Sequence, residues 1–206
     1  MPRDGRPNRN KILAAAKQEF LAKGFEGASI RAIAAEAGVT SAALYRHFEN
    51  KEALFNALVE PGLAAMNSWA AAHEQHAFSN IACSRSAGAI DQSEIDMIRE
   101  AVLPHRDCFK LLLCCAQGTQ HEHFVHDIVE LQQQSMQRAL SQLRNMGCPA
   151  AEISDSTLHL LLSAYVTALF EPIAHDYPQE DIEQYLLTMQ RFFLPGWQDI
   201  LGIKGP

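Results

Sequence analysis

Helical periodicity along most of the chain is the feature that most constrains its fold. In residues 8–23, apolar side chains recur every three or four positions, as at Ile12, Ala16 and Phe20, which is the spacing of one face of a helix. No segment shows the sustained alternation of apolar and polar residues that a half-buried strand requires. The sequence therefore predicts an all-α protein.

Glycine and proline divide this periodic sequence into about nine expected helices. We expect them over residues 8–23, 29–37, 41–48, 50–76, 91–103, 105–117, 122–146, 155–176 and 179–201. The expected N-caps of the second, third and fourth helices are Ser29, Thr40 or Ser41, and Asn50. Gly24 and Gly38 stand where a residue with positive φ would end a helix. The fourth helix is expected to bend at Pro61-Gly62, and the small, polar residues 77–88 are expected to form a loop.

Residues 29–45 have the pattern of two short helices joined by a tight turn. Ala34 is small enough to let the next helix cross closely, Gly38 suits the turn, and Val39 can fill the gap between the helices. Ile33 and Leu44 are expected to pack on the first helix. This is the logic of a helix-turn-helix, whose short second helix enters the major groove of DNA.

The charge distribution also singles out the N-terminal part. Residues 1–60 contain nine Lys/Arg and seven Asp/Glu, whereas residues 61–206 contain eight and seventeen. Only the N-terminal part is therefore expected to meet a polyanion.

The flanking residues extend this segment into a motif that resembles the TetR/AcrR family over roughly residues 12–58. The matching positions are Ala16 and Phe20, Gly24-Phe25, Ile30-Arg31, Ile33-Ala34, Ala37-Gly38-Val39, Leu44-Tyr45, His47-Phe48, Lys51-Glu52 and Leu54-Phe55. The resemblance implies a helix-turn-helix domain over residues 1–54 and a helical effector-binding and dimerisation domain over residues 55–206. It also implies a cytoplasmic homodimer that represses from a palindromic double-stranded DNA operator until a small-molecule effector releases it.

The resemblance assigns roles to eight residues of the N-terminal domain. The expected DNA contacts are Arg31, Thr40, Ser41, Ala42, Tyr45, Arg46, His47 and Lys51. Thr40, Ser41 and Ala42 would open the recognition helix against bases and backbone, and Arg46 could read a guanine. Tyr45, His47 and Lys51 would bind phosphates, with Lys51 helped by the positive end of the fourth helix.

The last two predicted helices have apolar surface wider than one stripe, which favours contact with both a core and a second copy. Earlier helices of the same domain are expected to line an effector pocket. Its candidate lining residues are Met66, Trp69, Phe109, Leu112, Phe124, Met136 and Tyr165, and they favour a largely apolar effector.

Other functions find less support in the sequence. His105, Cys108 and Cys115, followed by His121, His123 and His126, leave open a metal- or thiol-responsive regulator of the same fold, although the spacing matches no standard metal site. A ligand-binding module without DNA binding is a further alternative. We expect no catalytic residue, cofactor or membrane span, because no catalytic or phosphate-binding motif and no long apolar run occurs.

Overall fold

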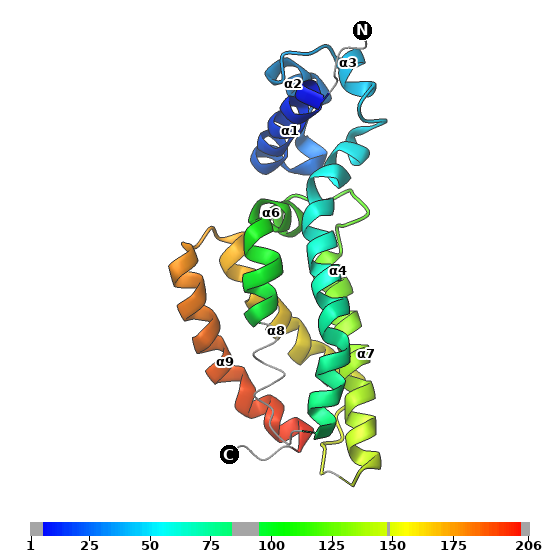
Figure 1. The fold of residues 1–206 in the computed structure, drawn as a ribbon, viewed down its shortest axis with the longest axis vertical. Helices are drawn as coiled ribbons and strands as arrows, with labels where there is room; N and C mark the ends of the chain where they lie inside the picture. Colours follow the sequence, from blue (N-terminus) through cyan, green and yellow to red (C-terminus); the bar gives the residue numbers. More distant parts are fainter. Residues whose placement is uncertain (1–5, 84–94, 148, 203–206) are drawn as a thin grey trace. The chain divides into compact units, whose positions relative to one another are not determined.

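The computed structural model describes residues 6–83, 95–147 and 149–202 (Figure 1). Within these ranges it contains eight α-helices and no strand. The prediction of an all-α protein with about nine helices is therefore confirmed. Residues 84–94 lie outside the described ranges, together with the predicted helix start at residue 91 and part of the loop predicted over residues 77–88.

The chain divides into two compact units. The first contains residues 1–64 and 105–122, and the second contains residues 65–104 and 123–206. The boundary predicted after residue 54 separates a DNA-binding domain from an effector-binding domain by function. The units are defined by packing alone, and the packing adds a downstream segment to the N-terminal unit. A segment more than 40 residues downstream, α6 with the turn after it, packs within the N-terminal unit.

The first unit consists of α1 (Arg6–Gly27), α2 (Ile30–Glu36), α3 (Ser41–Tyr45), the start of α4 (Lys51–Cys83) and α6 (Arg106–Cys114). Its core lies between these helices and includes the fully buried Ile12, Phe20, Leu44 and Phe55. The Phe20 ring stacks on Phe25 and meets Phe55 edge to face, a geometry that stabilises aromatic pairs beyond their burial.

Helix ends in this unit follow local sequence signals, with one exception. Gly24 has φ of 69° and ψ of 172° and breaks α1, as predicted. The side chains of Thr40 and Asn50 accept hydrogen bonds from the backbone N–H groups of the residues three positions later, which confirms both caps. Ser29 does not cap α2 with its side chain. Its own backbone N–H donates to Glu19 Oε1 at 3.1 Å instead, so Glu19 joins α1 to the start of α2.

Helix α4 continues through Pro61 and Gly62 and ends at Cys83. The loop predicted from residue 77 was therefore wrong for residues 77–83. Gly62 is buried where α4 crosses α6, and a Cβ atom there would lie 2.8 Å from Cys108 Cβ and 3.1 Å from Phe109 Cε2. The glycine thus permits a close helix crossing, and the bend predicted at Pro61-Gly62 stays a prediction.

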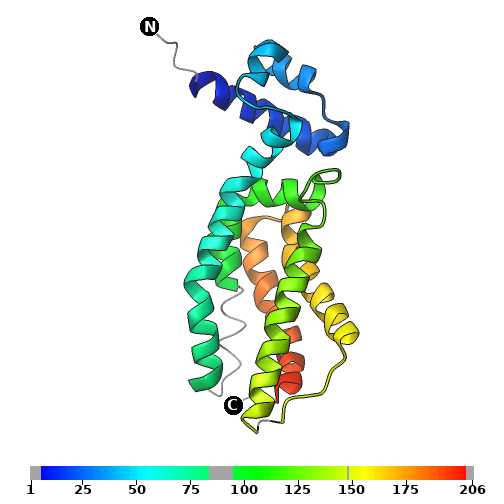
Figure 2. The ribbon, with the colours of Figure 1, turned by 90° about the vertical axis from the view of Figure 1, so that its right-hand side faces the viewer.

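The second unit is built on α7 (Phe124–Asn145), α8 (Asp155–Ala174) and α9 (Gln179–Leu201) (Figure 2). Helix α8 lies between the other two and buries eight of its side chains. By length and hydropathy α8 also meets the criteria for a membrane span, but a buried core helix meets the same criteria. In the described part of the helix predicted over residues 91–103, residues 95–97 are α-helical. A π-helix (Ile98–Val102) and a 3₁₀-helix (Leu103–His105) follow them, and the 3₁₀-helix includes Pro104.

Candidate nucleic-acid interface

Helices α2 and α3 form the compact motif predicted from residues 29–45. Gly38 has φ of 68°, and the N–H of Val39 donates to the carbonyl of Ala34 at 2.9 Å, which closes the turn between the helices. Ile33 and Leu44 are buried in the core of the unit. On the other side of α3, Ala42 and Tyr45 are exposed within the described part of the chain.

The predicted DNA contacts all belong to this motif or to its flanks. Thr40, Ala42, Tyr45, Arg46 and, on α2, Arg31 are exposed, whereas Ser41, His47 and Lys51 are half-buried. Tyr45 is 51% exposed, an unusual degree for a large aromatic side chain in the last turn of a helix. Five of the eight residues lie between Thr40 and Arg46, which makes α3 and its two caps the centre of the candidate interface.

Arg9 of α1 adds a positive charge beside this motif. Its guanidinium lies 5.2 Å from the ring centroid of Phe48, within the range of a cation–π contact. Phe48 directly follows Arg46 and His47, two of the predicted DNA contacts. The contact therefore places Arg9 beside the end of this segment. Because Arg9 and Phe48 lie 39 positions apart, the sequence alone carried no signal for this pairing.

Lys51 has a structural role that sequence reasoning missed. Its Nζ donates hydrogen bonds to the backbone carbonyls of Phe25 (2.7 Å), Glu26 (3.2 Å) and Ala28 (3.2 Å). It also lies 4.5 Å from the Phe25 ring centroid. These three acceptors match the three hydrogens of an ammonium group. Lys51 therefore fixes the end of α1 to the start of α4, and its predicted phosphate contact stays a prediction.

The seven residues predicted to line an effector pocket are distributed over both units. Phe109 and Leu112 are buried in the first unit. Phe124 packs on Phe170, and Tyr165 packs on Phe193 and Trp197, in the core of the second. The indole N–H of Trp69 donates to Glu100 at 3.2 Å, while Met66 and Met136 are half-buried. Phe109, Leu112, Phe124 and Tyr165 are thus buried in the packed core of their own unit, and the assignment of the seven residues to an effector pocket stays a prediction.

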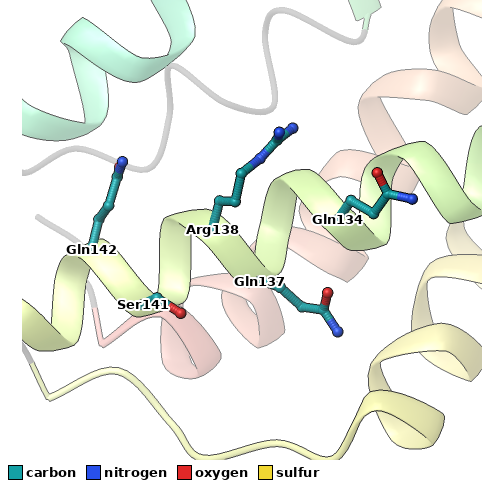
Figure 3. Close-up of a pocket in the computed structure, with 5 residues that line it drawn as sticks. All are labelled: Gln134, Gln137, Arg138, Ser141 and Gln142. Carbon is teal, nitrogen blue, oxygen red and sulfur yellow. The ribbon is translucent and has the colours of Figure 1, made fainter.

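The second unit has two clefts, and their described lining residues differ from the seven predicted ones. A cleft of about 550 Å³ runs along α7 (Figure 3), and its described lining residues are Gln134, Gln137, Arg138, Ser141 and Gln142. Arg138 and Gln142 project from the same side of the helix. A second cleft of about 480 Å³ involves the end of α8, with Glu171, Pro172, His175, Tyr177 and Tyr185 as its described lining. Each described residue of the wall along α7 carries a polar group at the end of its side chain.

The histidines and cysteines do not form a metal centre in the described part of the chain. No three His, Cys, Asp or Glu side chains within it are close enough to hold a metal ion together. Burial raises the pKa of the Cys108 and Cys115 thiols, and it therefore lowers the thiolate fraction on which cysteine reactivity depends. Neither the metal-responsive nor the thiol-responsive alternative gains support.

Large apolar side chains are exposed on the last two helices. Leu160 of α8 is 68% exposed and Phe192 of α9 is 78% exposed, and Leu161 of α8 and Tyr185 of α9 are exposed to a smaller extent. The hydroxyl of Tyr185 donates to the carbonyl of Ala168 at 2.8 Å and joins the two helices. We call these four residues the α8–α9 apolar surface. A surface of this kind is typical of a protein–protein contact.

Comparisons with known proteins agree with the architecture. A family model described as bacterial regulatory proteins, tetR family, matches residues 12–58. The HTH-type transcriptional regulator UidR of Escherichia coli (strain K12) is 39% identical over 59 residues, which are 29% of this chain and 30% of that protein. The tetracycline repressor protein class D of Escherichia coli is 29% identical over 157 residues, 76% of this chain and 66% of that one.

The fold resembles that of solved regulators over nearly the whole chain. NalD, the secondary repressor of the MexAB-OprM multidrug efflux pump in Pseudomonas aeruginosa, superposes with a TM-score of 0.54 at 23% identity, covering 91% of this chain and 97% of that one. At this identity the likeness concerns the fold. The match to UidR spans less than a third of that regulator's length.

Proposed function

We infer that this chain, which belongs to the tetR family of bacterial regulatory proteins, is a DNA-binding transcriptional regulator that represses from a palindromic operator. The observation that carries the proposal is the exposed side of α3, with Thr40, Ala42, Tyr45 and Arg46, within the segment that matches the family model. Small side chains, a tyrosine hydroxyl and one arginine suit the base edges and phosphates of a major groove. Similar proteins are regulators rather than enzymes, which supports a non-enzymatic, cytoplasmic protein.

A homodimer is the second part of the proposal. Two recognition helices one helical turn apart on DNA require a two-fold assembly. The α8–α9 apolar surface supports this assembly, because Leu160 and Phe192 would otherwise remain in water. A second copy can bury the same surface on both partners.

An effector that weakens DNA binding is the third part, and the cleft along α7 is its proposed site. Amide, hydroxyl and guanidinium groups form the described wall, so it suits a hydroxylated molecule with an anionic group better than the apolar effector expected from the sequence. Arg138 would pair with the anion. Thermal shift assays with gluconate, sorbitol and hexanoate test separately whether the site requires hydroxyl groups and whether it requires an anionic group. Only gluconate combines hydroxyls with a carboxylate.

Stabilisation by gluconate alone, lost in Arg138→Gln and kept in the exposed control Arg191→Gln, is the expected result. Equal stabilisation by hexanoate would favour an apolar site, and an unchanged response of Arg138→Gln would remove the assigned anion contact.

The DNA-binding proposal itself is tested by selection. The full chain is incubated with duplexes of random sequence, and bound DNA is amplified and sequenced over several rounds. We expect enrichment of a palindrome whose half-sites are centred about 34–36 Å apart. Arg46→Ala with Tyr45→Ala should abolish this enrichment, whereas the control Lys110→Ala, on α6, should retain it. Failure of the wild-type chain to enrich any sequence would reject the function.

A further inference from the structure

The turn between α6 and α7, residues 115–122, is built as a rigid structure of its own. Thr119 is buried, and its hydroxyl donates to the carbonyl of Ala116 at 2.7 Å and accepts from the N–H of His121 at 3.0 Å. The N–H of Gly118 donates to Glu122 Oε2 at 3.1 Å, and Gly118 has φ of 81°. Buried side-chain and backbone bonds of this kind hold a turn in one conformation.

This turn contacts the first two turns of α4. The N–H of Gln120 donates to Glu52 Oε1 at 3.2 Å. The imidazole Nε2 of His121 lies 3.1 Å from Asn56 Oδ1 and 3.3 Å from Gln120 Nε2. It donates to Asn56 in the tautomer that carries the proton on Nε2, and it accepts from Gln120 in the other tautomer. The His121 ring also lies over Phe55, with the ring centroids 6.4 Å apart.

The same turn contacts the end of α1. The N–H of Phe25 donates to the carbonyl of Cys115 at 2.9 Å. At Gly118 the backbone approaches Glu26 so closely that a Cβ atom would lie 3.0 Å from Glu26 Cγ. The end of α1 is also where Lys51 of α4 is bound. The start of α4 is therefore held on one side by α1 and on another by the α6–α7 turn.

We propose that the α6–α7 turn is a positioning element for the DNA-binding helices, and that His121 is its main positioning residue through Asn56. The inference rests on the proposed function. Only five residues separate the end of α3 from the start of α4, so the orientation of α4 constrains where α3 can lie. None of the residues of the turn is a predicted DNA contact, which makes the role separable from DNA binding itself.

The test compares four full-length variants with the wild type: His121→Ala, Asn56→Ala, the double variant, and His121→Gln, whose amide can still donate to Asn56. His126→Ala, an exposed histidine of α7, is the control. Fluorescence anisotropy measures affinity for the selected palindrome and for a random duplex. Mass-spectrometric hydrogen exchange measures protection of residues 51–58 without DNA.

We expect His121→Ala to lose roughly 5- to 30-fold in affinity for the palindrome, with affinity for the random duplex and the salt dependence unchanged because no phosphate contact is lost. His121→Gln should restore part of the loss, and the double variant should lose less than the sum of the single variants. Exchange in residues 51–58 should become faster in His121→Ala and stay unchanged in His126→Ala.

Wild-type affinity in His121→Ala, or an equal loss toward both duplexes, would overturn the positioning role while leaving the proposed function intact. If the wild type binds no DNA, the proposed function fails, and the exchange data still decide whether His121 holds α4.

Discussion

The ammonium of Lys51 lies 2.7 Å from the carbonyl oxygen of Phe25 and 4.5 Å from the centre of its ring. A cation at this position satisfies carbonyls at the negative end of α1 and faces the electron-rich side of an aromatic ring. The family motif implies a phosphate contact for the same lysine. The bonds to α1 and a phosphate contact would use the same three N–H hydrogens of Lys51. The two roles predict different effects of a substitution on stability and on the salt dependence of DNA binding.

Replacing Lys51 by Met separates these roles. If the bonds to α1 dominate, Lys51→Met should lower the free energy of unfolding by about 1–3 kcal/mol and leave the salt dependence of DNA binding unchanged. A phosphate contact would instead flatten the salt dependence by about one unit per half-site. Urea unfolding and anisotropy at several salt concentrations provide both values. Lys11→Met, at an exposed position of α1, is the control and should leave the free energy of unfolding unchanged.

The crossing of α4 and α6 depends on the missing side chain of Gly62. Gly62→Ala should destabilise the protein by about 1–3 kcal/mol, because the new methyl group would meet the Cβ of Cys108 at 2.8 Å and force the helices apart. The matched control is Gly27→Ala, whose Cβ would meet only Lys23 Cβ at an ordinary 3.5 Å. Equal thermal midpoints for the two variants would show that the crossing tolerates a side chain.

Glu19 should make the first unit sensitive to acid. Hydrogen bonds from the Lys23 side chain and from the Ser29 N–H lower the pKa of its carboxyl from the ordinary value of 4.5. A pKa that is lower in the folded state stabilises the protein above the unfolded-state value, and this stabilisation is lost as the pH falls through the folded-state value. Glu19→Gln should therefore unfold at a lower temperature than the wild type at pH 7.

The difference between Glu19→Gln and the wild type should disappear below the lowered pKa, where the wild-type carboxyl is also neutral. Thermal melts across this pH range measure it. A constant difference at every pH would mean that the charge of Glu19 contributes nothing.

The α8–α9 apolar surface should control assembly. Phe192→Glu should weaken the dimer by about 2 kcal/mol or more, because a carboxylate would enter an apolar contact. Leu131→Glu is the matched control, since Leu131 is also strongly exposed, at 66% against 78% for Phe192, but lies on α7. Sedimentation velocity over a concentration series measures the dimer dissociation constant of both variants. Dissociation of the control alone would place the interface on α7.

Local signals explain which parts of this structure the sequence could predict. The turn at Gly38 and the caps at Thr40 and Asn50 each depend on residues within five positions, and all three were predicted correctly. The bond between His121 and Asn56 joins residues 65 positions apart, and Gly62 meets Cys108 across 46 positions. Such pairs depend on how helices cross, which periodicity does not reveal.

The residues of an effector pocket were harder to predict from the sequence for the same reason. Apolar periodicity identified side chains such as Phe109 and Tyr165 as buried, and both are. Periodicity does not separate a residue that packs against its neighbours from one that faces a cavity. The described wall of the cleft along α7 consists of polar residues, for which apolar periodicity carries no signal.

The central claim is that α3 reads DNA symmetrically from two copies of the chain. The most direct measurement repeats the selection from random duplexes with Ser41→Ala and with Arg46→Ala, and compares each consensus with that of the wild type. The account predicts that each variant loses base preference at one position in each half-site, at places related by the two-fold axis, while the other positions are kept. An unchanged consensus in both variants, or a change in only one half-site, would contradict it.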